Sequence, residues 1–201
     1  VEGAYRFINK IWAVVAKNID SVRGAQAQQP PADGLRTCSV DLLRKTHQTI
    51  RKVTTDIEKD YHFNTAIAAL MELVNELAAY IPENDADSYV AAYVIRNTVL
   101  MLAPFAPHVA EELWAEIGGR GSIFEQPWPA WDESLAADEK IELVVQVNGK
   151  LRAKIMVPAG LSDADAKARA LSDAKVMEHT RHKQIVKVVV VQGRLVNVVV
   201  K

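Results

Sequence analysis

The histidines and acidic residues are the side chains in this sequence that could support metal binding or acid–base catalysis. No histidine pair has the spacing of a zinc site, so we expect all five histidines to be surface or capping residues. They are His47, His62, His108, His179 and His182. The acidic pair Glu111-Glu112 cannot act on one substrate atom, because adjacent helical residues point about 100° apart. With no glycine-rich phosphate loop and no His-x-Gly-His sequence, we expect neither a catalytic residue nor a metal site.

Basic side chains recur at intervals of seven residues in one expected helix. They are Arg44, Lys45, Arg51, Lys52 and Lys59. Seven residues make nearly two helical turns, so these cations share one side of the helix. Regularly spaced cations suit the phosphates of a nucleic acid. An ordinary solvated helix face, partly neutralised by Asp56 and Glu58, would give the same pattern, and the spacing alone leaves both interpretations open.

A second group of cations lies towards the end of the chain. It comprises Lys150, Arg152, Lys154, Lys183, Lys187 and Arg194. Residues 140–201 contain twelve Lys/Arg against five Asp/Glu, a net charge of +7, which leaves −8 for residues 1–139. A basic module suggests a polyanionic partner, although charge for solubility is an equal alternative. Because residues 140–201 lack Phe, Tyr and Trp, we expect contacts to phosphate, sugar or folded RNA shape rather than to stacked bases.

The composition limits the other classes of function. Of the 201 residues 49% are hydrophobic, enough for a buried core, yet no apolar run is long enough to span a bilayer. We therefore expect no membrane partner. The single Cys38 excludes an internal disulfide or a cysteine-based zinc cluster, and it fits a reducing, cytoplasmic setting. Since the sequence starts at Val1, without an initiator Met or a signal peptide, we expect a fragment of a longer protein.

Residues 1–118 show helical periodicity. The expected helices span about 3–17, 39–60, 63–81, 88–103 and 108–117. The expected N-caps are Ser39, then Asn64 or Thr65, then Asp87 or Ser88. Residues 18–37 are expected to break the helical pattern, because they contain Pro-Pro and lack apolar periodicity. Five amphipathic helices with short connections predict an antiparallel bundle.

Residues 119–139 are expected to form a linker. The run Gly118-Gly-Arg-Gly-Ser122 is flexible in composition. The segment Trp128-Pro-Ala-Trp131 is expected to be a docked loop, because exposed tryptophans are costly. At least one of the two tryptophans should therefore pack on the bundle.

Residues 140–201 change to the two-residue period of β-strands. Strands at 141–147 and 151–157 flank Asn148-Gly149, a favoured pair for a type I′ turn. Ser162 and Ser172 are expected to cap two short helices, the second ending near His179. Strands at 184–191 and 195–200 then meet at Gln192-Gly193. These elements predict a ββααββ domain with one sheet and helices on one face, and so an α+β chain of two domains.

Several separate blocks of this sequence resemble the C-terminal part of bacterial leucyl-tRNA synthetases. One is Met101-Leu-Ala-Pro-Phe-Ala-Pro-His-Val-Ala-Glu-Glu-Leu-Trp114, where Pro104 and Pro107 break the helix. The others span 3–12, 47–57, 63–75, 142–158 and 193–200. An isoleucine enzyme of this group would be expected to end in zinc-binding cysteines, and a valine enzyme in a coiled coil. Neither pattern occurs here.

The resemblance implies a function for the chain. In this family the full-length enzyme uses ATP and Mg to attach leucine to tRNA(Leu), with catalytic and editing motifs outside these 201 residues. The fragment would be non-catalytic, would need no cofactor, and would act beside the catalytic domain of the same polypeptide as a cytoplasmic monomer. Residues 1–118 would hold the tRNA body, and residues 140–201 would reach the tRNA elbow. All the cations named above would then be tRNA-binding residues.

Two other functions stay open at this stage. The chain could be a non-enzymatic adaptor that binds protein through an apolar patch. It could also be the corresponding region of another class Ia synthetase, specific for valine, isoleucine or methionine.

Overall fold

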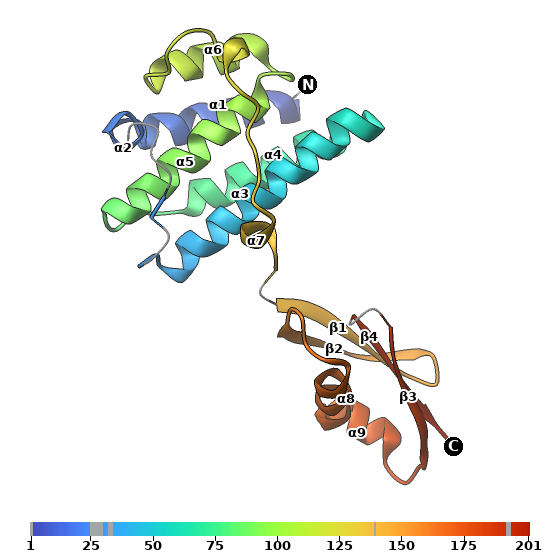
Figure 1. Cartoon of the computed structure of the whole chain (residues 1–201). Helices are drawn as coiled ribbons and strands as arrows, with labels where there is room; N and C mark the ends of the chain where they lie inside the picture. Colours follow the sequence, from blue (N-terminus) through green and yellow to red (C-terminus); the bar gives the residue numbers. More distant parts are fainter. Residues whose placement is uncertain (1, 25–29, 32–33, 139, 192–193) are drawn as a thin grey trace. The chain divides into compact units, whose positions relative to one another are not determined.

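A computed structural model describes residues 2–24, 30–31, 34–138, 140–191 and 194–201 (Figure 1). The chain forms two compact units, Val1–Ala137 and Asp138–Lys201. The first is helical and the second combines a sheet with helices, so the α+β class expected from the sequence is confirmed. The predicted turn at Gln192-Gly193 and most of the Gln/Ala/Pro-rich stretch at 25–33 fall outside the described residues.

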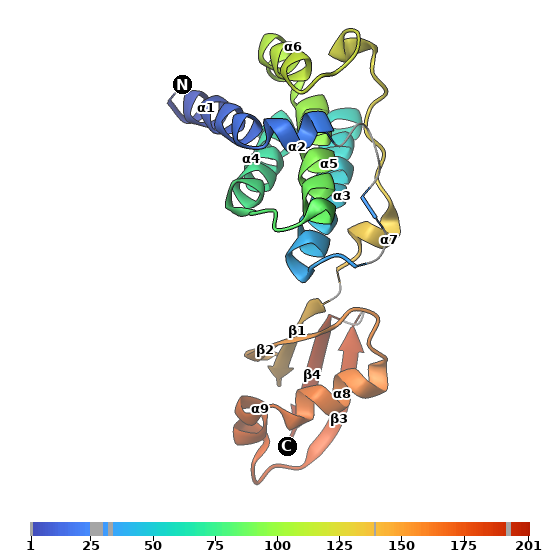
Figure 2. The ribbon, with the colours of Figure 1, turned by 90° about the vertical axis from the view of Figure 1, so that its left-hand side faces the viewer.

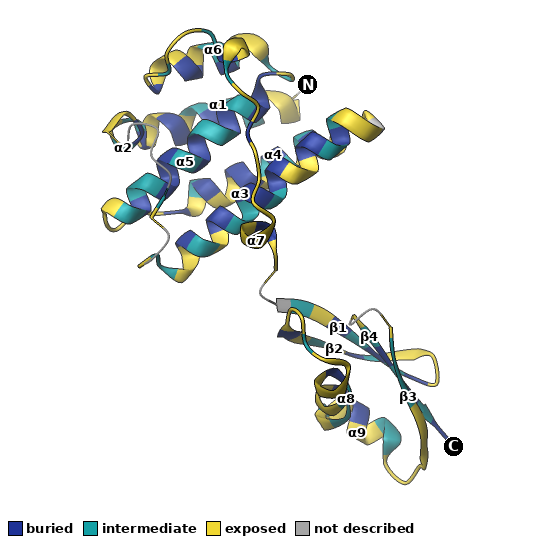
Figure 3. Cartoon of the chain, in the orientation of Figure 1, coloured by how far each residue is buried: buried dark blue, intermediate teal, exposed yellow. Residues whose placement is uncertain are grey.

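The first unit is built from helices packed around one apolar core. In chain order they are α1 (Glu2–Lys17), α2 (Ile19–Gly24), α3 (Thr37–Thr55), the π-helix η1 (Asp56–Asp60), α4 (Phe63–Ala79), α5 (Asp85–Leu102), α6 (Pro107–Glu116), the 3₁₀ turn η2 (Ile123–Glu125) and α7 (Glu133–Ala136). Figure 3 shows that the buried surface of α5 continues along most of its length. Ile95 and Val99 of α5 meet Ile11 of α1 and Leu73 of α4 in this core. The core therefore orients α1, α3 and α4 around α5.

The helix starts differ from the sequence expectations. Ser39 does not cap α3, which begins at Thr37 after Arg36; Ser39 is buried within the first turn of the helix. No side chain caps α4. Asn84, rather than Asp87 or Ser88, caps α5, since its side chain accepts a 2.8 Å hydrogen bond from the Asp87 backbone N–H. The predicted break at 18–37 is wrong for residues 19–24, which form α2.

The second unit contains a mixed four-stranded sheet. Its elements are β1 (Lys140–Val147), β2 (Lys150–Pro158), α8 (Asp163–Ser172), α9 (Ala174–Thr180), β3 (Ile185–Val191) and β4 (Leu195–Val200). The strand order is β2-β1-β4-β3, with β1 and β4 parallel and the other pairs antiparallel. Ser162 caps α8 as predicted, but Asp173 rather than Ser172 caps α9.

One sheet face carries the core of the second unit. Figure 2 shows α8 and α9 along the same face of the sheet. Ala166, Ala170 and Val176 of these helices are buried with Leu143 and Val196 of the strands. Small alanines allow the helices to lie close to the strands. The opposite sheet face has no helix of the described second unit packed on it.

Candidate nucleic-acid interface

The described residues contain neither a metal site nor a membrane-spanning helix. No cluster of three His, Cys, Asp or Glu side chains that could hold a metal ion occurs among the described residues. None of the helices in the described part of the chain is both long and apolar enough to cross a bilayer. His47 departs from the expectation that every histidine is a surface or capping residue, because it is buried within α3.

Arg44 and Arg51 of α3 contact a segment that follows them by 93 and 82 residues in the sequence. Arg44 Nη1 lies 2.5 Å from Asp41 Oδ1, and its Nε donates a 3.0 Å hydrogen bond to the Ala137 carbonyl. Arg51 Nη1 lies 2.8 Å from Glu133 Oε2. Both arginines therefore have partners inside the helical unit.

Lys45 and Lys52 are also paired within this unit. Lys45 Nζ lies 2.6 Å from Glu72 Oε2 on α4. Lys52 Nζ lies 2.6 and 2.7 Å from the two carboxylate oxygens of Asp56, which is buried. Burial favours a higher pKa for Asp56, but the hydrogen bonds from Lys52 and Thr65 outweigh it and hold the pKa below its usual value. Releasing Lys52 to another anion would leave that carboxylate uncompensated.

The residues 128–137, which we call the strap, run along α3. Figure 1 shows this yellow segment ending in α7 beside α3. Trp128 Nε1 donates a 2.8 Å hydrogen bond to Thr54 Oγ1, and the Asp132 N–H donates a 3.1 Å bond to His47 Nδ1. Gln48 Nε2 donates to the Ala136 carbonyl at 3.0 Å. The expectation that a tryptophan of the 128–131 segment packs on the helices is confirmed.

The side chains of α3 that contact the strap form a polar stripe, which the sequence analysis did not identify. Its members are Arg44, His47, Gln48, Arg51 and Thr54. The spacing i, i+3, i+4, i+7, i+10 places them on one side of a helix, and that periodicity was the available signal. Side chains of this stripe form hydrogen bonds with backbone groups of the strap. The strap needs such partners because no described strand pairs with its backbone.

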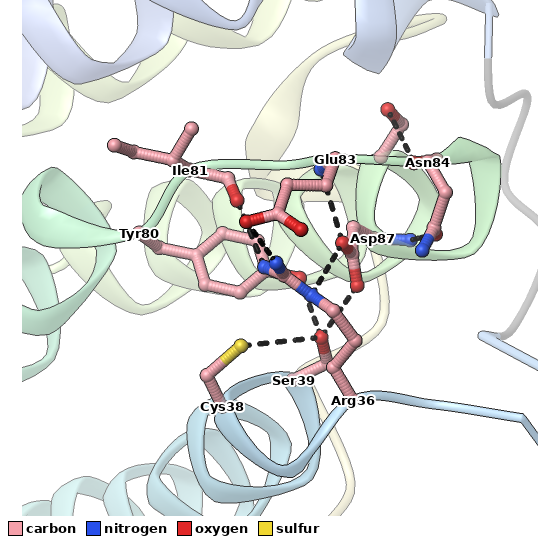
Figure 4. Close-up of polar contacts among 9 residues, drawn as sticks. Arg36, Cys38, Ser39, Tyr80, Ile81, Glu83, Asn84 and Asp87 are labelled. Atoms are coloured by element: carbon pink, nitrogen blue, oxygen red, sulfur yellow. Dashed lines mark hydrogen bonds and ion pairs between the residues drawn. The ribbon is translucent and has the colours of Figure 1, made fainter.

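A polar cluster around the buried Asp87 fixes the beginning of α3 (Figure 4). Asp87 accepts hydrogen bonds from Ser39 Oγ at 2.6 Å and from the Glu83 N–H at 3.0 Å. Arg36 Nε lies 2.9 Å from Asp87 Oδ2, and Arg36 also pairs with Glu83. Burial works to raise the pKa of Asp87, but the hydrogen bonds from Ser39 and Glu83 and the charge of Arg36 give a net lowering. The cluster joins α3 to the α4–α5 connection, which explains why Ser39 is not a helix cap.

The predicted cations of the second unit lie at the strand edges and ends. Lys154 on β2 pairs with Glu142 on β1 at 2.9 Å. Lys187 on β3 is opposite Val199, and Lys154 is opposite Val144. These two lysines project from the sheet face away from α8 and α9, but from opposite edge strands. Their rows are about 14 Å apart across the sheet and about 13 Å apart along the strands at the usual strand dimensions, since Val144 is level with Leu195 rather than with Val199. Lys150, Lys183 and Arg194 are exposed near strand ends.

Arg152 occupies an irregular position in β2. The register shifts between Val145 and Gln146, whose partners are Ala153 and Leu151, so Arg152 is the extra residue of a bulge. Its side chain is half-buried, and Nε has no hydrogen-bond partner among the described residues. Lys59, the last of the predicted α3 series, is exposed in η1 and has no ion pair with any described residue.

Comparisons with known proteins agree with this architecture. The family model for the anticodon-binding domain of tRNA ligase matches residues 41–168. Leucine–tRNA ligases from Geotalea uraniireducens (strain Rf4) and Thioalkalivibrio sulfidiphilus (strain HL-EbGR7) are 45% and 48% identical over 201 residues. Each match covers all of this chain and 24% of the relative, so the chain spans about a quarter of the relatives' length.

A solved structure is similar over nearly the whole chain. It is the ternary complex of the Agrobacterium radiobacter K84 agnB2 LeuRS with tRNA and LeuAMS. The TM-score is 0.85 at 32% sequence identity, and the match covers 99% of this chain and 25% of that one. This structural match agrees with the α+β fold of the chain. The chain belongs to the anticodon-binding domain family of tRNA ligases, and the relatives that match its whole length are leucyl-tRNA synthetases.

Proposed function

We propose that this chain is the tRNA-binding part of a leucine–tRNA ligase, the enzyme that attaches leucine to tRNA(Leu) using ATP. The observation that carries the proposal is the match to leucine–tRNA ligases along all 201 residues. The similar Agrobacterium structure was solved with tRNA, which supports the same partner here. In this proposal the chain holds tRNA(Leu), and the chemistry belongs to the rest of the relatives' length.

The proposal assigns a role to each part of the chain. Residues 1–118 form an antiparallel helical bundle of the class Ia synthetase anticodon-binding type. Residues 140–201 form a ββααββ domain for the tRNA elbow, and residues 119–139 join the two. The full-length enzyme would use ATP and Mg, while this part needs no cofactor. It would work beside the catalytic domain of the same polypeptide, as a cytoplasmic monomer.

The cations of the second unit are the proposed tRNA contacts. Lys150, Lys183, Lys187 and Arg194 are exposed, and Lys154 has only an exposed partner, Glu142. Exposed ion pairs contribute little to stability, so phosphate can replace such a partner at small cost. Arg152 would contribute beside them from the bulge, and Lys59 from the helical unit. We assign the four paired cations of α3 to the stability of the helical unit. One compensates the buried Asp56, two hold the strap and one joins α3 to α4, so tRNA binding through them would loosen contacts within the unit. These four are Arg44, Lys45, Arg51 and Lys52.

Filter binding of the chain to a tRNA(Leu) transcript tests the proposal. Affinity should fall steeply as the salt concentration rises, because phosphate contacts release counterions. ATP–pyrophosphate exchange should stay at background. Salt-insensitive binding, or no binding to tRNA(Leu), would contradict the proposal.

A protein-interaction adaptor is the competing function. The exposed aromatic pair Tyr61 and Phe63, whose ring centroids are 6.5 Å apart, is the observation that favours it. That function requires no RNA affinity. The salt titration with tRNA(Leu) therefore separates the two functions directly.

A further inference from the structure

The outer face of α1 carries cations that differ from those of α3. The residues are Arg6, Lys10 and Lys17, and all three are exposed. Their spacing of four and then seven residues places them within a narrow stripe, about 40° wide, at 100° per residue. Between Gly3 and Ile19 the sequence contains no Asp or Glu. The stripe is therefore uniformly positive along most of the helix.

The positive stripe is unusual for the unit that carries it. Residues 1–137 contain twelve Lys/Arg and eighteen Asp/Glu, a net charge of −6. On α3, four of the five predicted tRNA-binding cations are paired with carboxylates of the same unit. An acidic unit thus neutralises one basic helix, whereas on α1 the one ion pair among the described residues is the exposed Arg6–Glu2 pair.

The partners of the α1 cations are weak or neutral. Arg6 Nη2 lies 4.0 Å from Glu2 Oε1, with both side chains more than 70% exposed, so the pair contributes little. Lys10 Nζ donates a 2.5 Å hydrogen bond to Asn75 Oδ1 on α4, which leaves its charge uncompensated. Lys17 forms no ion pair with a described residue. All three charges are available to an external anion without loss of a buried contact.

The core holds this stripe in place. Ile11, Val14 and Val15 on the opposite side of α1 are buried, and Asn18 Nδ2 donates a 2.8 Å hydrogen bond to the Val14 carbonyl. Arg6 and Lys10 are about 6 Å apart along the axis and Lys10 and Lys17 about 10 Å apart, at 1.5 Å per residue. Ala13, between the two lysines, is exposed and small, so it leaves room for a sugar–phosphate strand.

We propose that Arg6, Lys10 and Lys17 of α1 bind the phosphate backbone of tRNA and are the main phosphate contacts of the helical unit. This inference rests on the proposed tRNA-binding function. The main contact of the helical unit with tRNA phosphates is then made by α1, and not by α3 as the sequence pattern suggested. Because phosphates carry no sequence information, the stripe contributes affinity and orientation rather than selection among tRNAs.

Removal of two α1 charges tests the inference in the whole chain. The variant R6Q/K17Q keeps the Lys10–Asn75 bond and should reduce the salt slope for tRNA(Leu) binding by about two units. The control R23Q/R120Q removes the same charge from exposed positions of the same unit and should keep the slope. Circular dichroism establishes that both variants are folded. A wild-type slope in R6Q/K17Q, or an equal loss in the control, would overturn the α1 assignment.

Lysine acetylation provides a second measurement on the unaltered chain. Bound tRNA(Leu) should protect Lys10 and Lys17 from the reagent, and leave the reactivity of Lys45 and Lys52 unchanged. Protection of Lys45 and Lys52 without Lys10 and Lys17 would overturn the assignment. If the wild-type chain does not bind tRNA(Leu), the proposed function fails and the α1 inference with it. If it binds while R6Q/K17Q binds equally well, the α1 inference fails alone.

Discussion

The side chain of Asn148 is hydrogen-bonded to both backbone groups of Val200, 52 residues further along the chain. Its Nδ2 donates to the Val200 carbonyl at 3.0 Å, and its Oδ1 accepts from the Val200 N–H at 2.9 Å. Asn148 has φ 48° and Gly149 has φ 77°, which confirms the turn expected from the Asn-Gly pair. One residue therefore turns the β1–β2 hairpin and also holds the end of β4.

We expect Asn148→Gly to destabilise the second unit. Glycine keeps the positive φ of the turn but removes both hydrogen bonds, so the loss should be about 2 kcal/mol at about 1 kcal/mol per bond. Hydrogen exchange of the 195–200 segment measures the effect. Asn148→Asp is the matched variant: it retains the acceptor for the Val200 N–H but turns a carboxylate oxygen towards the Val200 carbonyl, so it should also lose protection. Equal hydrogen-exchange protection in the wild type and both variants would show that the Asn148–Val200 hydrogen bonds do not stabilise the second unit.

The strap should loosen in mildly acidic solution. Burial lowers the pKa of His47, while the charge of Asp132 opposes the shift. Neutral His47 accepts a hydrogen bond from the Asp132 N–H, and a protonated ring cannot. Tyr93 from α5 and Asp132 from the strap are the titratable groups that face this ring. The pKa of His47 is lower in the folded than in the unfolded protein. The free energy of unfolding is therefore highest above a pH of about 6.5, and it falls as the pH decreases towards the folded-state pKa of His47.

Urea unfolding followed by tryptophan fluorescence measures this dependence, because all four tryptophans lie in residues 1–137. His47→Gln is the control, since its side-chain oxygen can accept the same bond but does not titrate. The variant should lose the pH dependence of stability that the wild type shows below about pH 6.5. The same slope in both proteins would assign the titration to another group.

Gly119 is required by the position of Trp114. A Cβ atom added at Gly119 would lie 2.2 Å from Trp114 Cε2, and the Gly119 N–H bonds to the Trp114 carbonyl at 2.8 Å. Gly119→Ala should therefore destabilise the helical unit by about 1–3 kcal/mol, the usual cost of overpacking. At Gly3 an added Cβ meets nothing within 4 Å, so Gly3→Ala should be neutral or stabilising. Equal urea midpoints for the two variants would contradict this packing argument.

Periodicity and turn chemistry predicted the elements formed by nearby residues. The Asn148-Gly149 hairpin and the Ser162 cap depend on contacts within a few residues, and both were correct. The role of Ser39 depends on Asp87, 48 residues away, so local capping preference misassigned it. The docking of the Trp128–Trp131 segment was expected, but its hydrogen-bond partners on α3 and the partners of the α3 cations were missed for the same reason. Charge spacing identifies a helix face but not which carboxylates the fold brings to it.

Lys52 provides the sharpest test of how the α3 cations differ from those of α1. Lys52→Ala should destabilise the helical unit by about 1–3 kcal/mol, because Asp56 stays buried after losing its charged partner. Its pKa should then rise, so that stability lost on acidification is lost at higher pH than in the wild type. The salt slope for tRNA(Leu) binding should stay unchanged under conditions where the variant is folded.

Lys17→Ala, which breaks no ion pair with a described residue, should show the reverse: an unchanged urea midpoint and a slope reduced by about one unit. A reduced slope with unchanged stability for Lys52→Ala would show that Lys52 binds phosphate despite its partner.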